Sequence, residues 1–321
     1  MKNYLKTYSG LIASVAYSLI VRYLAEWNII QINSISYLIV TPMVSGYLPY
    51  LFENKHFIRN IYKCLTLPII SALLFLLIAV ITRIEELICF VIIGIPYLIV
   101  SIVVSLYFRN RILNRKDTEP KSNYIPFIFL PLVLGTIEKN SQKMESYHLV
   151  ENQIEINSSS SNVWKCLYEV PNLSKYTQTS LINYLGVPKP VNSTYDSKKN
   201  IRLGYFDNGL ILNEKVIETI HEKKLGFAID FSKSNLNQNL TLKNIVKERS
   251  MVFDGIIYEL TPINNSKSIL KLRCNYRLNT NLTPYASYIT YKILNDFETN
   301  LLGALKCKLE SEQSNYRLIK P

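Results

Sequence analysis

The sequence has few of the residues that bind metals or close disulfides. It holds three histidines and five cysteines in 321 residues, without a Cys-x-x-Cys or His-Glu-x-x-His motif. Glycine-rich phosphate loops and nucleophile elbows are also lacking. We therefore expect no metal site and no cofactor. The cysteines form an odd, scattered set, as a reducing compartment tolerates. They are Cys64, Cys89, Cys166, Cys274 and Cys307.

Acidic residues are scarce relative to basic ones. Lysine and arginine total 36 against 24 aspartates and glutamates, which gives a net charge of +12. The basic residues are dispersed along the chain rather than interleaved with aromatics in a stripe, so we expect no nucleic-acid partner. A basic face can instead lie against anionic lipid, and a lipid bilayer is the partner that this charge favours.

Long apolar runs are confined to the first third of the chain. A spanning helix needs about 20 mostly apolar residues, and the sequence predicts a transmembrane all-α region of four helices within residues 1–120. The four predicted helices lie at about 8–27, 33–52, 64–82 and 87–108. We expect Arg22, near the end of the first, to reach toward the membrane surface; a buried functional arginine is the alternative. Few other ionisable residues lie within these spans, which argues against an ion or proton path.

The charges of the connections predict an orientation. Lys2 and Lys6 precede the first span, and the connections 53–63, with His56, and 109–116 are basic. The other two connections are neutral or acidic. Because basic loops stay in the cytoplasm, we expect an integral protein of the plasma or inner membrane with its N-terminus and C-terminal domain cytoplasmic. A signal peptide cleaved at "SVA" is the competing interpretation, but the apolar run before it is short.

Residues 121–147 form a predicted interfacial linker. Its segment "YIPFIFLPLVLG" (124–135) is apolar but too short to span, and prolines interrupt it. We expect this segment to lie at the membrane interface or to pack against the four helices. The alternative is a fifth span, which would move the following domain outside. Asn-x-Ser/Thr sequons such as those at Asn192 and Asn281 would then matter.

From residue 148 the apolar pattern changes to the two-residue period of strands. A first strand at 150–157 leads through Ser158 to Asn162, which can cap a helix that Pro171 ends. A second short helix is expected at 179–186, and Asn208-Gly209 indicates a hairpin turn. The further predicted strands are 200–206, 210–220, 224–231, 251–260 and 268–279, followed by an amphipathic helix at 284–311 and a tail at 313–321.

This order of elements predicts an α+β domain over 148–312. A curved antiparallel sheet wrapped around the final helix would bury all the apolar faces. Such a sheet and helix can leave a deep apolar cavity between them, where a ligand would bind.

Three stretches in this domain resemble a known superfamily. They are "IEINSSSSNVWKCLYEV" (154–170), "GYFDNGLILNEKV" (204–216) and "LTPYASYITYKILNDFETNLLGALK" (282–306). In this order they are similar to the first strand and helix, the first hairpin and the final helix of the polyketide cyclase, Bet v 1 and StAR-related lipid-transfer (SRPBCC) superfamily. The resemblance covers about 148–311 and implies a helix-grip fold with a pocket for a hydrophobic ligand. The four-helix region is similar to membrane modules that precede such domains.

Large apolar residues on the predicted inner faces are the candidate ligand contacts. Trp164 is expected to be a packing residue first and a cavity-rim residue second, since large inward aromatics belong to the core unless the sheet stands off from the helix. The candidates are Trp164, Tyr205, Phe227, Tyr258, Tyr276, Ile289, Ile293 and Phe297.

Two carboxylates are the weak candidates for catalysis. Glu214, like Glu218, shares strand parity with apolar neighbours, and Asp254 lies within an apolar strand. A carboxylate among apolar side chains can act as acid or base, although we expect these residues to face water. His221 lies in a predicted turn, and we expect it to be solvated.

The sequence therefore favours a membrane-anchored domain that binds a lipid or another hydrophobic small molecule, rather than an enzyme. One alternative is a cyclase- or aromatase-type enzyme that uses a cavity carboxylate. The other is a structural or signalling membrane protein whose soluble domain, with a collapsed cavity, binds a protein partner.

Overall fold

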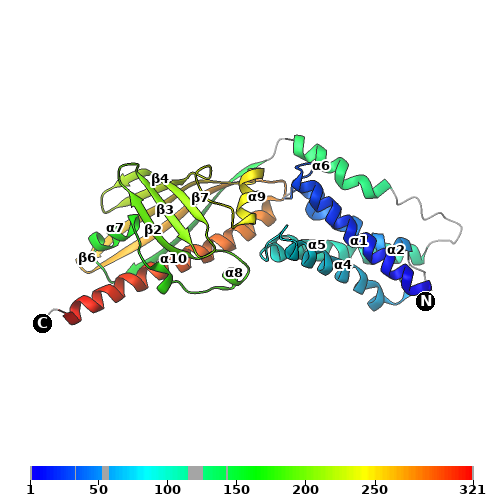
Figure 1. Cartoon of the computed structure of the whole chain (residues 1–321), viewed down its shortest axis with the longest axis horizontal. Coiled ribbons are helices and arrows are strands. Elements are labelled where there is room, and N and C mark those ends of the chain that lie inside the picture. Colours follow the sequence, from blue (N-terminus) through cyan, green and yellow to red (C-terminus); the bar gives the residue numbers. More distant parts are fainter. Residues whose placement is uncertain (1, 33, 53–57, 115–125, 142–143, 320–321) are drawn as a thin grey trace. The chain divides into compact units, whose positions relative to one another are not determined.

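The computed structural model describes residues 2–32, 34–52, 58–114, 126–141 and 144–319. His56 lies outside these residues. The chain forms two compact units, one made of Met1–Met144 with Thr280–Leu282 and the other of Glu145–Asn279 with Thr283–Pro321 (Figure 1).

The first unit is helical. A π-helical turn, η1, runs directly into α2, and a second such turn, η2, runs into α5. The elements are α1 (Lys2–Glu26), η1 (Ser36–Val40), α2 (Thr41–Phe52), α4 (Ile61–Ile81), η2 (Phe90–Gly94), α5 (Ile95–Leu113) and α6 (Leu130–Asn140). Helices thus occupy all four segments that the sequence predicts as spans.

Two of these helical segments are long and apolar enough to cross a membrane. Among the described residues they are Cys64–Ile81, with a mean hydropathy of 2.8, and Phe90–Leu113, with 2.4. Length and composition alone also admit the core helix of a soluble protein. The four predicted spans are therefore not established by this criterion.

Arg22 does not reach the surface of the first unit, contrary to the expectation. Its side chain is fully buried, and its Nε donates a hydrogen bond to Glu85 in the turn after α4. Its Nη2 donates to the carbonyl of Ile84 at 3.0 Å, and its Nη1 lies 2.7 Å from Glu26. An acidic partner on another segment therefore keeps this guanidinium inside, and the unit does hold a buried ion pair.

Small residues bring the helices of the first unit close together. A Cβ atom added at Gly46 of α2 would lie 2.7 Å from the carbonyl oxygen of Ser101 on α5. The hydroxyl of Ser105 donates to the carbonyl of Gly46 at 2.9 Å, and that of Ser14 on α1 donates to Ser45 at 2.8 Å. Backbones in near contact and hydroxyls bonded to carbonyls are typical of membrane helix pairs.

The helix α6 runs alongside α1 in the same direction. Tyr17, midway along α1, donates to the carbonyl of Ile128 at 2.8 Å, just before α6 begins. At the other end of α6, Glu138 accepts hydrogen bonds from the backbone of Ile35 at 3.0 Å and of Ser36 at 2.8 Å, where η1 begins. The carboxylate thus caps the start of η1, as anions do at helix N-termini.

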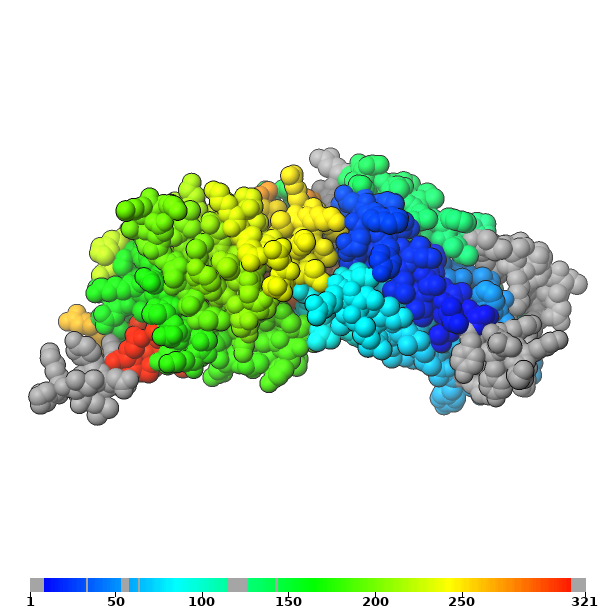
Figure 2. Space-filling view, in the orientation of Figure 1, coloured from blue at the N-terminus to red at the C-terminus, as the bar shows by residue number. Residues whose placement is uncertain are grey.

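The second unit contains a seven-stranded antiparallel sheet in the order β1-β7-β6-β5-β4-β3-β2. The strands are β1 (Glu145–Ile156), β2 (Pro190–Asp196), β3 (Ile201–Phe206), β4 (Ile211–Ile220), β5 (Lys224–Ile229), β6 (Met251–Asn264) and β7 (Lys267–Asn279). Residues of β2, β3, β4 and α9 cover much of the visible face of this unit, in green and yellow (Figure 2). The sequence predicts each strand except β2, because prolines and polar residues interrupt the alternating apolar pattern there.

A long helix, α10, packs along β1 and β7 (Figure 1). It continues to Ile319, so the predicted tail at 313–321 is helical over most of its length. The helical elements of this unit are α7 (Ser160–Tyr168), η4 (Leu173–Lys175), α8 (Leu181–Tyr184), α9 (Leu240–Glu248) and α10 (Thr283–Ile319). This sheet and helix agree with the predicted α+β, helix-grip arrangement.

The main core lies between the sheet and the carboxy-terminal half of α10. It joins residues of α7, such as Val163 and Leu167, to the inward residues of β5–β7 and to Leu302, Leu305 and Leu309. By contrast, within the fully described stretch 283–297 of α10, every residue is half-buried or exposed. The two halves of the helix therefore differ in how completely the sheet covers them.

Candidate functional site

The inner face of the second unit carries a buried ion pair. Arg202 of β3 and Glu214 of β4 are cross-strand neighbours, and the Nε of Arg202 lies 2.5 Å from the Oε2 of Glu214. The Nη1 of Arg202 donates to the carbonyl of Leu167 at 2.7 Å. The guanidinium also lies over the ring of Phe227, 4.0 Å from its centroid. This is a closed, hydrogen-bonded arrangement of the kind that buried charges require.

The charges of this pair stabilise each other. Burial by itself lowers the pKa of Arg202, but the charge of Glu214, its hydrogen bond and the contribution of Tyr258 together outweigh burial and raise the pKa above its ordinary value. Glu214 is only 5% exposed, so the expectation that it faces water is wrong. A role for Glu214 as acid or base would require breaking this ion pair, and the structure gives it the role of counter-ion.

A second buried carboxylate lies on α10. Glu298 is 2% exposed, and its Oε2 accepts a hydrogen bond from the Nδ2 of Asn152 on β1 at 2.9 Å. Its Oε1 has no hydrogen-bond partner within the part of the chain that the structure describes. Burial raises the pKa of Glu298 to about 7, the Asn152 bond acts against this rise, and the charge of Glu151 adds to it.

Glu298 marks the boundary between the two halves of α10. Leu302, one turn later, is 1% exposed and belongs to the main core, whereas Leu294, one turn earlier, is half-buried. Phe206 of β3 stacks on Phe297 with ring centroids 6.2 Å apart, and both rings remain half-buried. The sheet thus meets this part of the helix with apolar side chains that it does not bury fully.

Three predicted contact residues belong to the main core. Trp164 is 7% exposed and makes edge contacts with the rings of Tyr168 and His221, each at 5.7 Å. Phe227 and Tyr258 meet edge to face at 6.2 Å and are almost fully buried. Their position supports the packing role that we expect first for Trp164.

The other predicted contacts are dispersed. Tyr205 lies on the outer face of β3, because side chains alternate across a strand and its neighbour Phe206 contacts α10. Its predicted place on the inner face is therefore wrong. Tyr276 is buried in a separate cluster, stacked on His148 at 5.3 Å. The remaining two, Ile289 and Ile293, are half-buried on α10.

The remaining ionisable candidates face solvent. Asp254 is exposed and forms an ion pair with Arg277 at 2.9 Å, and Glu218 pairs with Lys224 at 2.9 Å. His221 is exposed in a turn, as expected. Among the described residues, no group of three or more histidine, cysteine or acidic side chains could hold a metal ion.

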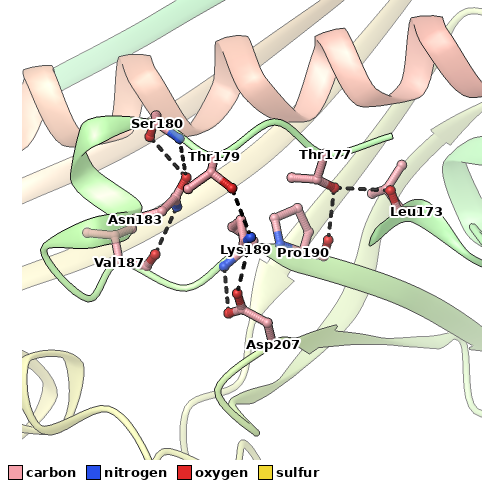
Figure 3. Close-up of polar contacts among 9 residues, drawn as sticks. All are labelled: Leu173, Thr177, Thr179, Ser180, Asn183, Val187, Lys189, Pro190 and Asp207. Carbon is pink, nitrogen blue, oxygen red and sulfur yellow. Dashed lines mark hydrogen bonds and ion pairs between the residues drawn. The ribbon is translucent and has the colours of Figure 1, made fainter. Parts of the chain in front are cut away.

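A polar segment between η4 and β2 is tied to its neighbours at several points (Figure 3). The backbone N–H of Lys189 donates to the Oδ1 of Asp207 at 2.9 Å, and its Nζ lies 3.1 Å from the Oγ1 of Thr179. Ser180 and Asn183 form a capping box on α8, and the Oγ of Ser180 donates to Asp296 of α10 at 2.7 Å. These bonds fix the segment against α10 two residues before Glu298.

Sequence reasoning missed Arg202, Asn152 and Glu298. Arg202 stands between apolar Ile201 and Leu203, so alternation assigns it to the outside. Glu298 had a usable signal, since it lies four residues after Leu294 and four before Leu302, on one side of the helix.

The second unit is thus an α+β domain with a seven-stranded antiparallel sheet on a long helix. No protein-family model and no curated protein matches the sequence. Among solved structures, a START superfamily protein from Mycobacterium smegmatis is 7% identical, with a TM-score of 0.36 over 51% of this chain and 98% of that chain. A point mutant of Thalictrum norcoclaurine synthase with a transition-state analogue is 13% identical, with a TM-score of 0.33 over 54% and 99%. Identities and TM-scores this low do not assign a function.

Proposed function

We propose that this chain is a membrane-anchored protein whose second unit binds a lipid or another hydrophobic small molecule. The observation that carries this proposal is the incomplete burial of an apolar surface between α10 and the sheet. Leu294 and Phe297 of α10, with Phe206 and Ile256 on the sheet, point inward yet remain half-buried. A lipophilic ligand that covered them would gain about 25 cal/mol for each Å² of apolar surface removed from water.

The distribution of residues in the first unit supports membrane anchoring. Along α1, Ile12 is 63% and Ile20 59% exposed, while Ser14, Ser18 and Arg22 are buried. The same reversal holds on α5, where the apolar residues Ile95, Ile99 and Val103 are exposed and Ser101 and Ser105 are buried. Water-soluble proteins place such residues the other way round, whereas lipid-facing helices carry apolar side chains outside and small or polar ones between helices.

Contacts within the first unit bear on its orientation in a membrane. Arg109, near the end of α5, donates to the carbonyls of Ile58 at 3.0 Å and Arg59 at 2.8 Å. The described parts of both basic connections therefore lie at one end, where Gly10 of α1 also meets Pro49 of α2. By the positive-inside rule this end is cytoplasmic.

The helix α6 then leads the chain away from that end. It starts beside the middle of α1 and finishes at Ser36 and Asn28, at the opposite end of the unit. The second unit begins soon afterwards, at Glu145. The helix α6 has 11 residues and is therefore about 16 Å long, roughly half of what a crossing needs. We therefore keep the cytoplasmic second unit that the loop charges favour, with a fifth crossing as the alternative.

Native mass spectrometry of the full chain tests ligand binding. Protein released from lipid nanodiscs made with a membrane extract should retain a co-purifying lipophile of defined mass. Repeated recovery of the bare chain, with the second unit still folded, would contradict a binding function and favour a domain that only contacts protein partners.

Labelling of Cys307 tests the topology. This is the one cysteine classed as exposed among the five, so a membrane-impermeant maleimide should reach it in intact cells if the second unit lies outside. Labelling that requires permeabilised membranes would place the unit in the cytoplasm. A Cys307→Ser variant supplies the background.

A further inference from the structure

Glu298 occupies the centre of the inward side of α10. Its neighbours one turn away on the same side are Leu294 and Leu302, and its hydrogen-bond donor, Asn152, comes from β1. At such a position a leucine would pack better than a carboxylate.

The hydrogen bonds of Glu298 are incomplete. The Nδ2 of Asn152 donates to its Oε2 at 2.9 Å and also to the Oδ1 of Asn295 at 3.2 Å. The Oε1 is buried and has no partner among the described residues. A buried polar atom without a partner is uncommon and costly, because it has given up its bonds to water.

The charges around Glu298 restrict which ligand group can donate a hydrogen bond to its Oε1. Arg202, a buried cation on the inner face of the sheet, is already held by Glu214 and by the carbonyl of Leu167. The charge of Glu151 also acts on Glu298. An anionic head group would therefore meet negative charge while Arg202 is already engaged, and an ammonium group would have to lose its hydration in an apolar surrounding. An uncharged donor avoids both costs.

We infer that the Oε1 of Glu298 accepts a hydrogen bond from the hydroxyl group of a lipophilic alcohol, whose apolar body lies against the half-buried side chains between α10 and the sheet. This inference rests on the proposed binding function and names the class of its ligand. Leu294 and Phe297 lie on the turn before Glu298, so the apolar body would extend toward the amino-terminal half of α10.

A pair of probes that differ in one hydrogen-bond donor tests the inference on the unaltered full chain. A pyrene-labelled long-chain alcohol and its methyl ether have the same apolar body, but only the alcohol can donate to Glu298. In detergent micelles the protein should bind the alcohol about tenfold more tightly than the ether, the factor that one buried hydrogen bond supplies.

Variants at Glu298 locate the effect. Glu298→Met should bind both probes equally, because it removes the acceptor and keeps an apolar side chain of similar length. Glu298→Gln keeps an acceptor oxygen and should retain the preference for the alcohol. Glu312→Gln alters an exposed acidic residue on the same helix, paired with Lys308 at 2.7 Å, and should behave like the unaltered chain.

The outcomes separate the two proposals. If neither probe binds the unaltered chain, the proposed binding function is wrong, and so is the proposed hydrogen bond to Glu298. If both probes bind with equal affinity, the binding function stands, but the hydrogen bond from a ligand hydroxyl to the Oε1 of Glu298 is wrong. A preference for the alcohol that persists in Glu298→Met would also overturn the assignment to Glu298.

Discussion

Two buried carboxylates of the second unit differ in how their charge is compensated. Glu214 lies 2.5 Å from the guanidinium of Arg202, which also bonds a carbonyl oxygen. Within the described part of the chain, Glu298 receives one amide hydrogen bond and forms no ion pair. Removing either partner of the first pair would leave a buried charge without a counter-ion. Glu298 can instead lower the free-energy cost of its buried charge by taking up a proton. The two residues therefore respond differently to pH.

Replacing Glu298 with glutamine should flatten the pH dependence of stability. Burial raises the pKa of Glu298 from 4.5 to about 7, so the folded state holds its proton more tightly than the unfolded state. The associated stabilisation is fully present below about pH 4.5 and is lost as the pH rises from there through about 7, with a total of about 3 kcal/mol.

Urea unfolding in detergent at about pH 5 and about pH 8 measures this effect. The fluorescence of Trp164 reports on the second unit once exposed Trp27 is replaced by phenylalanine. The unaltered chain should lose more stability between the two pH values than Glu298→Gln. Equal losses in the two proteins would show that other groups govern this pH range.

At the scale of single elements, close helix contacts make the first unit sensitive to added atoms. Gly46→Val would place a Cβ 2.7 Å from the carbonyl oxygen of Ser101 and disturb the bond from Ser105 to Gly46. Because the obstacle is backbone, α2 and α5 must separate, at a cost of about 1–3 kcal/mol or more. We expect a clearly lower thermal midpoint for the detergent-solubilised protein.

Gly303 provides a matched control for this substitution. It also lies within a helix, but an added Cβ there would meet no atom within 4 Å. Gly303→Ala should stabilise α10 slightly, since glycine costs about 1 kcal/mol in a helix interior. Equal effects at the two glycines would contradict the close approach of α2 and α5.

Elements were predictable from the sequence where local pattern and packing agree. Along β7 the alternation of Leu272, Cys274 and Tyr276 with charged residues matches their burial. In β3 the same rule fails, because the buried side chain is Arg202, whose partner Glu214 lies on another strand. Alternation reports hydropathy, and it cannot show that a charge has a counter-ion across the sheet.

The predicted final helix is confirmed, but the candidate contacts on it lie on one row. Ile289, Ile293 and Phe297 follow every fourth residue, and since an α-helix has 3.6 residues per turn, such a row drifts around the axis by about 40° per step. These three stay half-buried, whereas Glu298 and Leu302 are buried. Hydropathy does not show which side of a helix the sheet covers, so the Oε1 of Glu298, unpartnered among the described residues, could not be foreseen.

At the scale of the whole molecule, the exposed apolar surface of the first unit predicts stable membrane integration. After alkaline carbonate treatment the full chain should remain with the membrane pellet, because the exposed side chains of α1, α4 and α5 would lose their lipid contacts in water. Release into the supernatant would identify the first unit as a soluble helical bundle. A peripheral membrane protein from the same cells serves as the release control.

The ion pair between Arg22 and Glu85 has a consequence for how the protein is made. The two residues are 63 positions apart, and a ribosome adds roughly 5–20 residues per second. In the proposed membrane arrangement, α1 therefore emerges several seconds before Glu85 exists, and until then only Glu26 on the same helix can pair with Arg22. The buried side of α1 is thus completed only after α4 and the following turn have been translated.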